Sequence, residues 1–237
     1  MSLLTLDRLS VSIGQYAVLH DVGFTVPEGG VFVLLGRNGA GKSTTLRAIM
    51  GLWRPSPGSI RFGGDDLTTL HTSDIARRGI AYVPENMGIF GGLTVEENMV
   101  LATAKGSFDA RRLDWVQTLF PALKKFWDKP AGALSGGQKQ MLAVARAIIE
   151  PRRLILVDEP TKGLAPAIVD AMAEGFREIS RETTILLVEQ NFAFARSLGR
   201  DMAVIEDGRI VHTGSMADFA ADAALQHRLL SLSAEGV

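Results

Sequence analysis

Residues 36–43 read Gly-Arg-Asn-Gly-Ala-Gly-Lys-Ser, which fits the pattern G-x-x-x-x-G-K-[ST] and constrains the fold more than any other segment. The preceding residues 31–35 form a short, continuous apolar run that is typical of a buried parallel strand. Residues 44–50 have helical spacing, and Gly51 follows as a plausible stop. The alternative is a glycine turn that ends in Lys-Ser by coincidence. A strand, a glycine loop and a helix in this order favour a site for a nucleoside triphosphate.

Each residue type in this loop suits phosphate binding. The glycines let backbone amides turn toward a polyphosphate, and the helix N-terminus adds its positive end. We expect Lys42 to reach the β- and γ-phosphates and the Ser43 hydroxyl to hold Mg²⁺. The predicted nucleotide-binding residues of the loop are Gly36, Asn38, Gly39, Ala40, Gly41, Lys42, Ser43 and Thr44.

Composition narrows the remaining possibilities. The 237 residues suffice for one large domain or two small ones. The formal net charge of −1 does not indicate a positively charged surface for binding nucleic acid. Cysteine is absent, which excludes disulfides, thiolate metal sites and a cysteine nucleophile. No apolar run approaches the roughly 18–20 residues of a membrane span, and the N-terminus does not resemble a signal peptide. We therefore expect a soluble chain, with any membrane role supplied by a partner.

The order of patterns predicts an α/β fold. Apolar residues alternate along residues 4–26, as in antiparallel strands, and residues 94 to about 130 look helical. Continuous apolar runs return at residues 154–157 and 184–188, as in strands covered on both faces. Residues 202–211 predict a hairpin on the Asp207-Gly208 turn. This pattern indicates an antiparallel sheet at the front, a core sheet and a helical insert.

Two acids follow the apolar run at residues 154–157. Asp158 and Glu159 would lie at the carboxyl end of a buried strand, where ligands of open α/β sheets bind. There Asp158 can hold the metal shell, and Glu159 can orient and deprotonate an attacking water. The alternative is two loop acids without a catalytic role.

A second anion-binding pattern, Leu-Ser-Gly-Gly-Gln, occupies residues 134–138. Its glycines leave bare backbone amides, Ser135 adds a hydroxyl, and a helix continues toward Pro151. One chain has no use for two triphosphate cradles this far apart unless the second serves another subunit.

These three motifs, in this order, resemble those of the ATP-binding-cassette ATPases over nearly the whole chain. The resemblance implies ATP and Mg²⁺ as cofactors and an α/β P-loop fold with an N-terminal antiparallel β part, a mainly parallel core sheet and a helical insert. It implies a single domain over residues 2–234, with the antiparallel part at about 2–30 and 58–72 and the insert at about 92–148. Two such domains would pack head to tail. Residues 134–138, the signature motif, would then contact ATP bound to the other subunit. The contacting residues would be Ser135, Gly136, Gly137 and Gln138.

Three departures from the usual family pattern narrow the resemblance. Glu85 replaces the usual glutamine, which gives a third candidate metal ligand beside Ser43 and Asp158, and Gln190 replaces the usual switch histidine. Residues 160–166 lack the Leu-Asp pair that is common in the dimer-contact loop of this family. Together these features resemble the ATPase subunits of bacterial importers for branched-chain and other hydrophobic amino acids, with Glu159 and Gln190 as the catalytic pair. Related importers of urea or short amides remain an alternative, and an exporter is a weaker one.

The same resemblance suggests partners and a location. The implied partners are two membrane permease subunits, a second ATPase subunit (identical or distinct) and, indirectly, a solute-binding protein. Binding to the permease subunits would place the chain at the cytoplasmic face of the inner membrane. Met87, Ile89 and Phe90 would form a docking groove, although each could be plain core. Ile13 stands where the family usually has an adenine-stacking aromatic residue, and Tyr16 is the candidate replacement.

Overall fold

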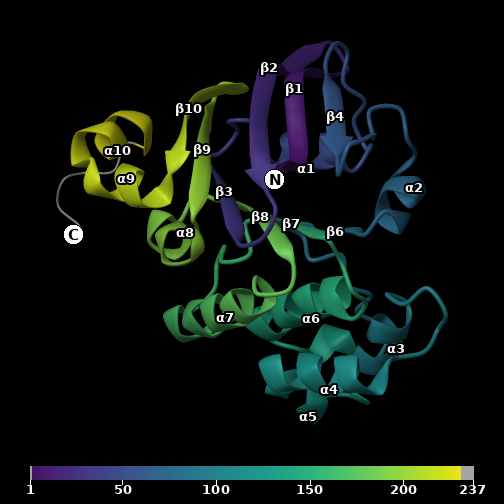
Figure 1. Cartoon of the computed structure of the whole chain (residues 1–237). Helices are drawn as coiled ribbons and strands as arrows, with labels where there is room; N and C mark the ends of the chain where they lie inside the picture. The colour runs from purple at the N-terminus through teal and green to yellow at the C-terminus, as the bar shows by residue number, and fades with distance from the viewer. Residues whose placement is uncertain (1, 231–237) are drawn as a thin grey trace.

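The computed structural model describes residues 2–230, and its strands form two sheets (Figure 1). The predicted domain end at residue 234 lies outside these described residues. The first sheet is antiparallel, with strand order β2-β1-β4-β5. Its strands are β1 (Ser2–Ile13), β2 (Tyr16–Pro27), β4 (Ser59–Phe62) and β5 (Asp65–Asp66). The predicted antiparallel front sheet is therefore present.

The second sheet has strand order β10-β9-β3-β8-β7-β6, and all its pairs are parallel except that of β10 with β9. This mainly parallel sheet is the core that the sequence predicts. Its strands are β3 (Val31–Leu35), β6 (Ile80–Val83), β7 (Leu154–Asp158), β8 (Thr184–Glu189), β9 (Asp201–Glu206) and β10 (Arg209–Ser215).

Helices cover the parallel sheet, and one helical group extends away from it beneath β6 and β7 in Figure 1. This group contains α3 (Val95–Val100), α4 (Ala110–Leu119), α5 (Pro121–Lys125) and α6 (Gly136–Ile148), as the predicted insert requires. The others are α1 (Lys42–Ile49), α2 (Thr72–Arg77), α7 (Pro166–Ile179), α8 (Phe192–Leu198), α9 (Met216–Ala221) and α10 (Ala223–Leu230). In the described part of the chain, every helix is too short or too polar to cross a lipid bilayer.

The parallel sheet separates two hydrophobic cores. On one face, Phe32 and Leu34 of β3 pack into a core shared with α1 and the antiparallel sheet. On the other face, Val31, Val33 and Leu35 pack into a core shared with α6, α7 and α8. Side chains of successive strand residues point to opposite faces, so a strand buried on both faces must be apolar throughout. This explains the continuous apolar runs.

The strand register sets the position of the candidate site. Leu35 pairs with Glu189, and Asp158 pairs with Val188, so β3, β8 and β7 end at the same edge. The phosphate loop follows β3, the two acids close β7 and Gln190 follows β8. Parallel strands thus bring together three segments that lie far apart in the sequence.

Candidate nucleotide-binding site

The glycine loop adopts a conformation that requires glycine at several positions. Gly39 and Gly41 have φ angles of 82° and 106°, which lie in the left-handed region. A Cβ atom on Gly36 would lie 2.4 Å from the carbonyl oxygen of Ile205, and one on Gly41 would lie 2.7 Å from Leu19 Cδ2. The loop backbone therefore fits tightly between β9 and β2.

The loop and the first turn of α1 present unpaired backbone donors. Among the described residues, the amides of Gly41, Lys42, Ser43 and Thr44 donate to no protein acceptor. Such amides at a helix N-terminus attract anions because of their partial positive charge. The cradle therefore fits a polyphosphate, as the sequence predicts.

Lys42 is buried at the base of this cradle. Its Nζ atom donates to the carbonyl oxygens of Gly36 and Arg37 at 2.8 and 3.0 Å, and it lies 3.0 Å from Glu159 Oε1. Only 4% of the Lys42 side chain is exposed. An ammonium group held at the loop carbonyls stands beside the amides that would bind phosphate, so its charge adds to theirs.

The candidate metal ligands Ser43 and Asp158 contact each other. Ser43 Oγ donates to Asp158 Oδ1 at 2.9 Å, and the Tyr82 hydroxyl donates to Asp158 Oδ2 at 3.1 Å. Burial raises the pKa of Asp158, and the two hydrogen bonds oppose that shift. Burial, followed by the charge of Asp158, raises the pKa of Tyr82 to about 12. Tyr82 therefore remains a hydrogen-bond donor that orients the carboxylate.

The third candidate ligand, Glu85, is engaged by a lysine. Lys162 Nζ lies 2.6 Å from Glu85 Oε1 and 3.8 Å from Glu159 Oε2, so it links both acids. The hydrogen bond to Glu85 raises the pKa of Lys162. Among the described residues, no group of three His, Cys, Asp or Glu side chains could hold a metal ion alone. A metal here would need hydroxyl and phosphate oxygens to complete its shell.

Glu159, the predicted general base, follows β7 with an unusual backbone. Its φ is 45°, an uncommon conformation for a residue with a side chain, and its amide donates to the Val188 carbonyl at 3.0 Å. The carboxylate is paired with Lys42 at 3.0 Å. The backbone turn thus directs this side chain toward the phosphate loop.

A cleft of about 360 Å³ joins these groups. Ala40 and Gly36 do not line this cleft, because they support the loop from behind, and neither does Asp158, which is buried behind Ser43. A larger cavity of about 690 Å³ lies between α4 and the end of α6, away from the loop. The cleft is lined by Val18, Asn38, Gly39, Gly41, Lys42, Ser43, Thr44, Glu85, Glu159 and Lys162.

Gln190 lies at the edge of the sheet where β3, β7 and β8 end, but it does not line this cleft. It follows Glu189, the partner of Leu35, so its backbone lies beside the start of the phosphate loop. The residue is exposed, and its amide donates to Glu189 Oε2 at 3.0 Å. Its predicted contact with phosphate stays a prediction.

The signature residues lie apart from the cleft, at the N-terminus of α6. Ser135 and Gln138 form a capping box, in which Ser135 Oγ accepts from the Gln138 amide and Gln138 Oε1 accepts from the Ser135 amide. Gly137 packs against α7, where a Cβ would lie 2.6 Å from Ile168 Cγ2, whereas Gly136 faces open space. None of these residues lines the cleft, and their contact with ATP bound to a second subunit stays a prediction.

The candidate adenine-stacking residue lies at the first hairpin. Tyr16 pairs directly with Ile13 across the hairpin, and its side chain is 80% exposed. Two residues further along β2, Val18 lines the cleft. The exposed ring of Tyr16 therefore belongs to a residue two positions before one that lines the cleft.

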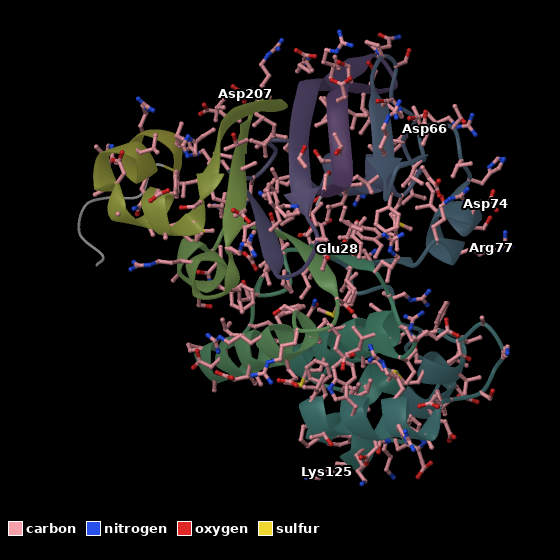
Figure 2. The ribbon with its side chains drawn as sticks, viewed as in Figure 1. Glu28, Asp66, Asp74, Arg77, Lys125 and Asp207 are labelled. Carbon is pink, nitrogen blue, oxygen red and sulfur yellow. The ribbon has the colours of Figure 1, made fainter. Side chains whose placement is uncertain are left out.

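Several residues that support the site were not predicted from the sequence. Tyr82 and Lys162 carried no motif, although Lys162 stands three residues after a predicted catalytic acid. Gly208 belongs to the predicted hairpin, where Asp207 and Gly208 have φ angles of 45° and 70° (Figure 2 labels Asp207). The Gly208 amide donates to the Ala40 carbonyl at 2.9 Å, so this turn braces the phosphate loop. Pairing of a turn with a loop 168 positions earlier is not visible in local sequence.

The comparisons with known proteins agree with this geometry. The family model of the ABC transporter matches residues 19–162, which run from the edge of the cleft through the phosphate loop and signature to the two acids. The chain belongs to the ABC transporter family. It is similar to a solved structure described as the ATP-binding subunit of an ABC transporter, with 31% identity, a TM-score of 0.82 and 97% of each chain covered. The prediction of an ATP-binding ATPase cassette is thereby confirmed.

Two relatives of this ABC family member carry more specific names. The high-affinity branched-chain amino acid transport ATP-binding protein BraG of Pseudomonas aeruginosa is 42% identical over 213 residues, covering 88% of this chain and 91% of the relative. The probable branched-chain amino acid transport ATP-binding protein LivF of Archaeoglobus fulgidus is 32% identical, covering 88% and 90%.

Proposed function

We propose that this cassette hydrolyses ATP to power an importer of branched-chain and other hydrophobic amino acids. The observation that carries the proposal is the 42% identity with BraG over nearly the full length of both chains. The replacements Glu85 and Gln190 and the absence of Leu-Asp after the acids support it. Related urea or short-amide importers are the alternative. An exporter is less well supported, because exporters usually keep the glutamine and histidine.

The residues of the site have separate roles in this proposal. The loop amides and Lys42 bind the phosphates, and Glu159 orients the attacking water and takes its proton. Ser43, Asp158 and Glu85 would hold Mg²⁺, and Glu85 would become available once Lys162 releases it. When bound, Mg²⁺ neutralises charge on the β- and γ-phosphates. Gln190 donates a hydrogen bond to the γ-phosphate without adding charge.

A cleft on the helical side supports the predicted membrane partners. It measures about 380 Å³ and is lined by Met87, Gly88 and Arg146, among others. Arg146 donates to the Gly88 carbonyl and lies 5.3 Å over the Phe90 ring. Of the predicted docking residues, Met87 lines this cleft, Ile89 packs on the core and Phe90 is 50% exposed. A short helix of a permease subunit would dock here, holding the chain at the cytoplasmic face of the inner membrane.

The site roles are tested by two variants of the isolated cassette. Lys42→Ala should weaken ATP binding, because the buried ammonium is lost. Glu159→Gln should retain ATP binding and lower turnover by about two to four orders of magnitude, because the general base is lost. Phosphate release and a nucleotide-binding titration measure the two effects. Normal turnover by both variants would contradict the roles.

The transported solute is tested in proteoliposomes. The cassette is reconstituted with the permease subunits and the solute-binding protein that it is proposed to serve, and uptake of labelled leucine and urea is measured with ATP inside the vesicles. We expect leucine uptake that the Glu159→Gln cassette does not support. Uptake of urea alone would establish the alternative, and ATP-driven solute efflux would overturn import.

A further inference from the structure

Glu189 is a buried acid at the carboxyl end of β8, and its carboxylate is fully used. Only 2% of the residue is exposed. Oε1 accepts from the Thr161 hydroxyl at 2.7 Å and from the Thr161 amide at 3.3 Å. Oε2 accepts from the amides of Gln190 and Asn191, both at 3.0 Å. All four partners are donors, which is the environment that an ionised carboxylate needs when it is buried.

These hydrogen bonds join two loops that both approach the nucleotide cleft. Thr161 lies two residues after Glu159, and Gln190 begins the loop after β8. The pairing of β7 with β8 ends at Asp158 and Val188, so pairing between these two strands does not join the two loops beyond that point. The Glu189 carboxylate therefore continues the connection between the two loops where the β7–β8 ladder ends.

The connection encloses the unusual backbone of Glu159. This residue has a φ of 45°, and its amide is held by the Val188 carbonyl on one side. Two residues later, Thr161 is held by Glu189. A backbone outside the common regions persists only when its surroundings fix it, and such positions cluster at active sites. Releasing Thr161 would let Glu159 relax toward an ordinary conformation.

We propose that Glu189 is a positioning residue for ATP hydrolysis. It locks the loop of Glu159 to the loop of Gln190, so that the general base and the phosphate sensor keep a fixed relation. Glu189 lies behind the cleft and does not line it, so it affects turnover and leaves ATP binding unchanged. The inference rests on the proposed hydrolytic roles of Glu159 and Gln190.

Near-isosteric variants test the two halves of the connection. Glu189→Gln keeps one acceptor for Thr161 but turns an amide NH₂ toward the Gln190 and Asn191 amides, where donors would meet donors. Thr161→Val removes the hydroxyl, and Thr161→Ser retains it. We expect kcat to fall about tenfold in Glu189→Gln and Thr161→Val, the Kd for ATP to change less than twofold, and Thr161→Ser to retain most of the activity.

Double-mutant analysis separates coupling from general damage. If both residues act through one connection, the double variant should be no slower than the slower single variant. Multiplied losses would overturn the inference. Thr184→Val is the matched control, because Thr184 Oγ1 accepts from the Gly29 amide at 2.8 Å at the opposite end of β8. That variant should lower Tm without changing kcat.

The outcomes also separate this inference from the proposed function. If the wild-type cassette hydrolyses ATP and Glu159→Gln does not, but Glu189→Gln and Thr161→Val retain full kcat, the positioning role alone fails. If Glu189→Gln does not fold, the comparison of Thr161→Val with Thr161→Ser decides the question. Absence of Lys42-dependent turnover in the wild-type cassette would instead reject the proposed function.

Discussion

At the scale of one residue, the proposed metal-binding role of Asp158 opposes the stability of the protein. The residue is fully buried, and among the described residues its two oxygens accept hydrogen bonds from the side chains of Ser43 and Tyr82. Taking a carboxylate out of water disfavours its charged form, and this effect exceeds that of the two hydrogen bonds. The charge that suits a metal ion is thus a burden to the ligand-free protein.

This opposition predicts a pH-dependent gain for Asp158→Asn. Because the folded-state pKa lies above the ordinary 3.8, the wild-type chain loses stability as pH rises from 3.8 through the folded-state pKa. Asparagine is neutral throughout, so its Tm advantage over the wild-type chain should be smaller near pH 4.5 than at pH 7.5.

Thermal scans without nucleotide or Mg²⁺ measure this effect. Asp170→Asn, a change of an exposed acid on α7, serves as the control. A Tm difference for Asp158→Asn that is the same at every pH would contradict the prediction. The same variant should lose ATP turnover, since a neutral amide is a poor ligand for Mg²⁺.

At the scale of elements, the β9–β10 hairpin acts as a brace. Its turn lies at the tip labelled by Asp207 in Figure 2. The Gly208 amide donates to the Ala40 carbonyl, and the Gly208 carbonyl accepts from the His20 amide at 2.8 Å. A single turn therefore connects the phosphate loop with the antiparallel sheet.

Gly208→Ala should damage this brace. Its Cβ would lie 2.1 Å from the Val18 carbonyl oxygen, in addition to the strain of a φ of 70°. We expect a loss of at least about 1 kcal/mol in stability and a weaker ATP affinity, because the loop and Val18 must move. Thermal unfolding and ATP titration measure the two effects.

Gly64→Ala is the matched control for this variant. Gly64 has a φ of 95°, but a Cβ there meets nothing within 4 Å. It should lower Tm through backbone strain alone and leave ATP affinity unchanged. Equal losses of ATP affinity in both variants would show that the hairpin does not act through the phosphate loop.

The sequence predicts those elements whose structure is determined by residues close to one another in the chain. The apolar run of β3 with its glycine loop, the acids closing β7 and the Asp207-Gly208 turn all carry their signals within a few residues. The hydrogen bond of Tyr82 to Asp158 and that of Thr161 to Glu189 depend on the register of β6, β7 and β8. Register among parallel strands follows from crossover packing, so no short pattern reports it.

At the scale of the whole molecule, the phosphate loop and the signature lie on different parts of the fold. The loop follows β3 between the two sheets, whereas Ser135 caps α6 in the helical group below them (Figure 1). If the phosphate-loop face of each subunit binds the signature face of the other, the two subunits form a closed dimer. Two sites would then form between two subunits.

Mixing inactive variants tests this shared arrangement. Lys42→Ala and Ser135→Arg should each be inactive alone, whereas their heterodimer keeps one site with both Lys42 and Ser135 intact. An equal mixture should recover at most about a quarter of wild-type ATP turnover, since half of the dimers carry one of two sites. Turnover that tracks each subunit separately, without dependence on protein concentration, would refute the shared site.

The alternation along β3 has a consequence for changes of chain length. Deleting or inserting one residue between Val31 and Leu35 would exchange the side chains delivered to the two cores and shift the loop that follows. The loop between α3 and α4 carries no such constraint, because its residues pair with no strand. In a library of single-codon deletions and insertions, functional clones should therefore be found in that loop and be absent from β3.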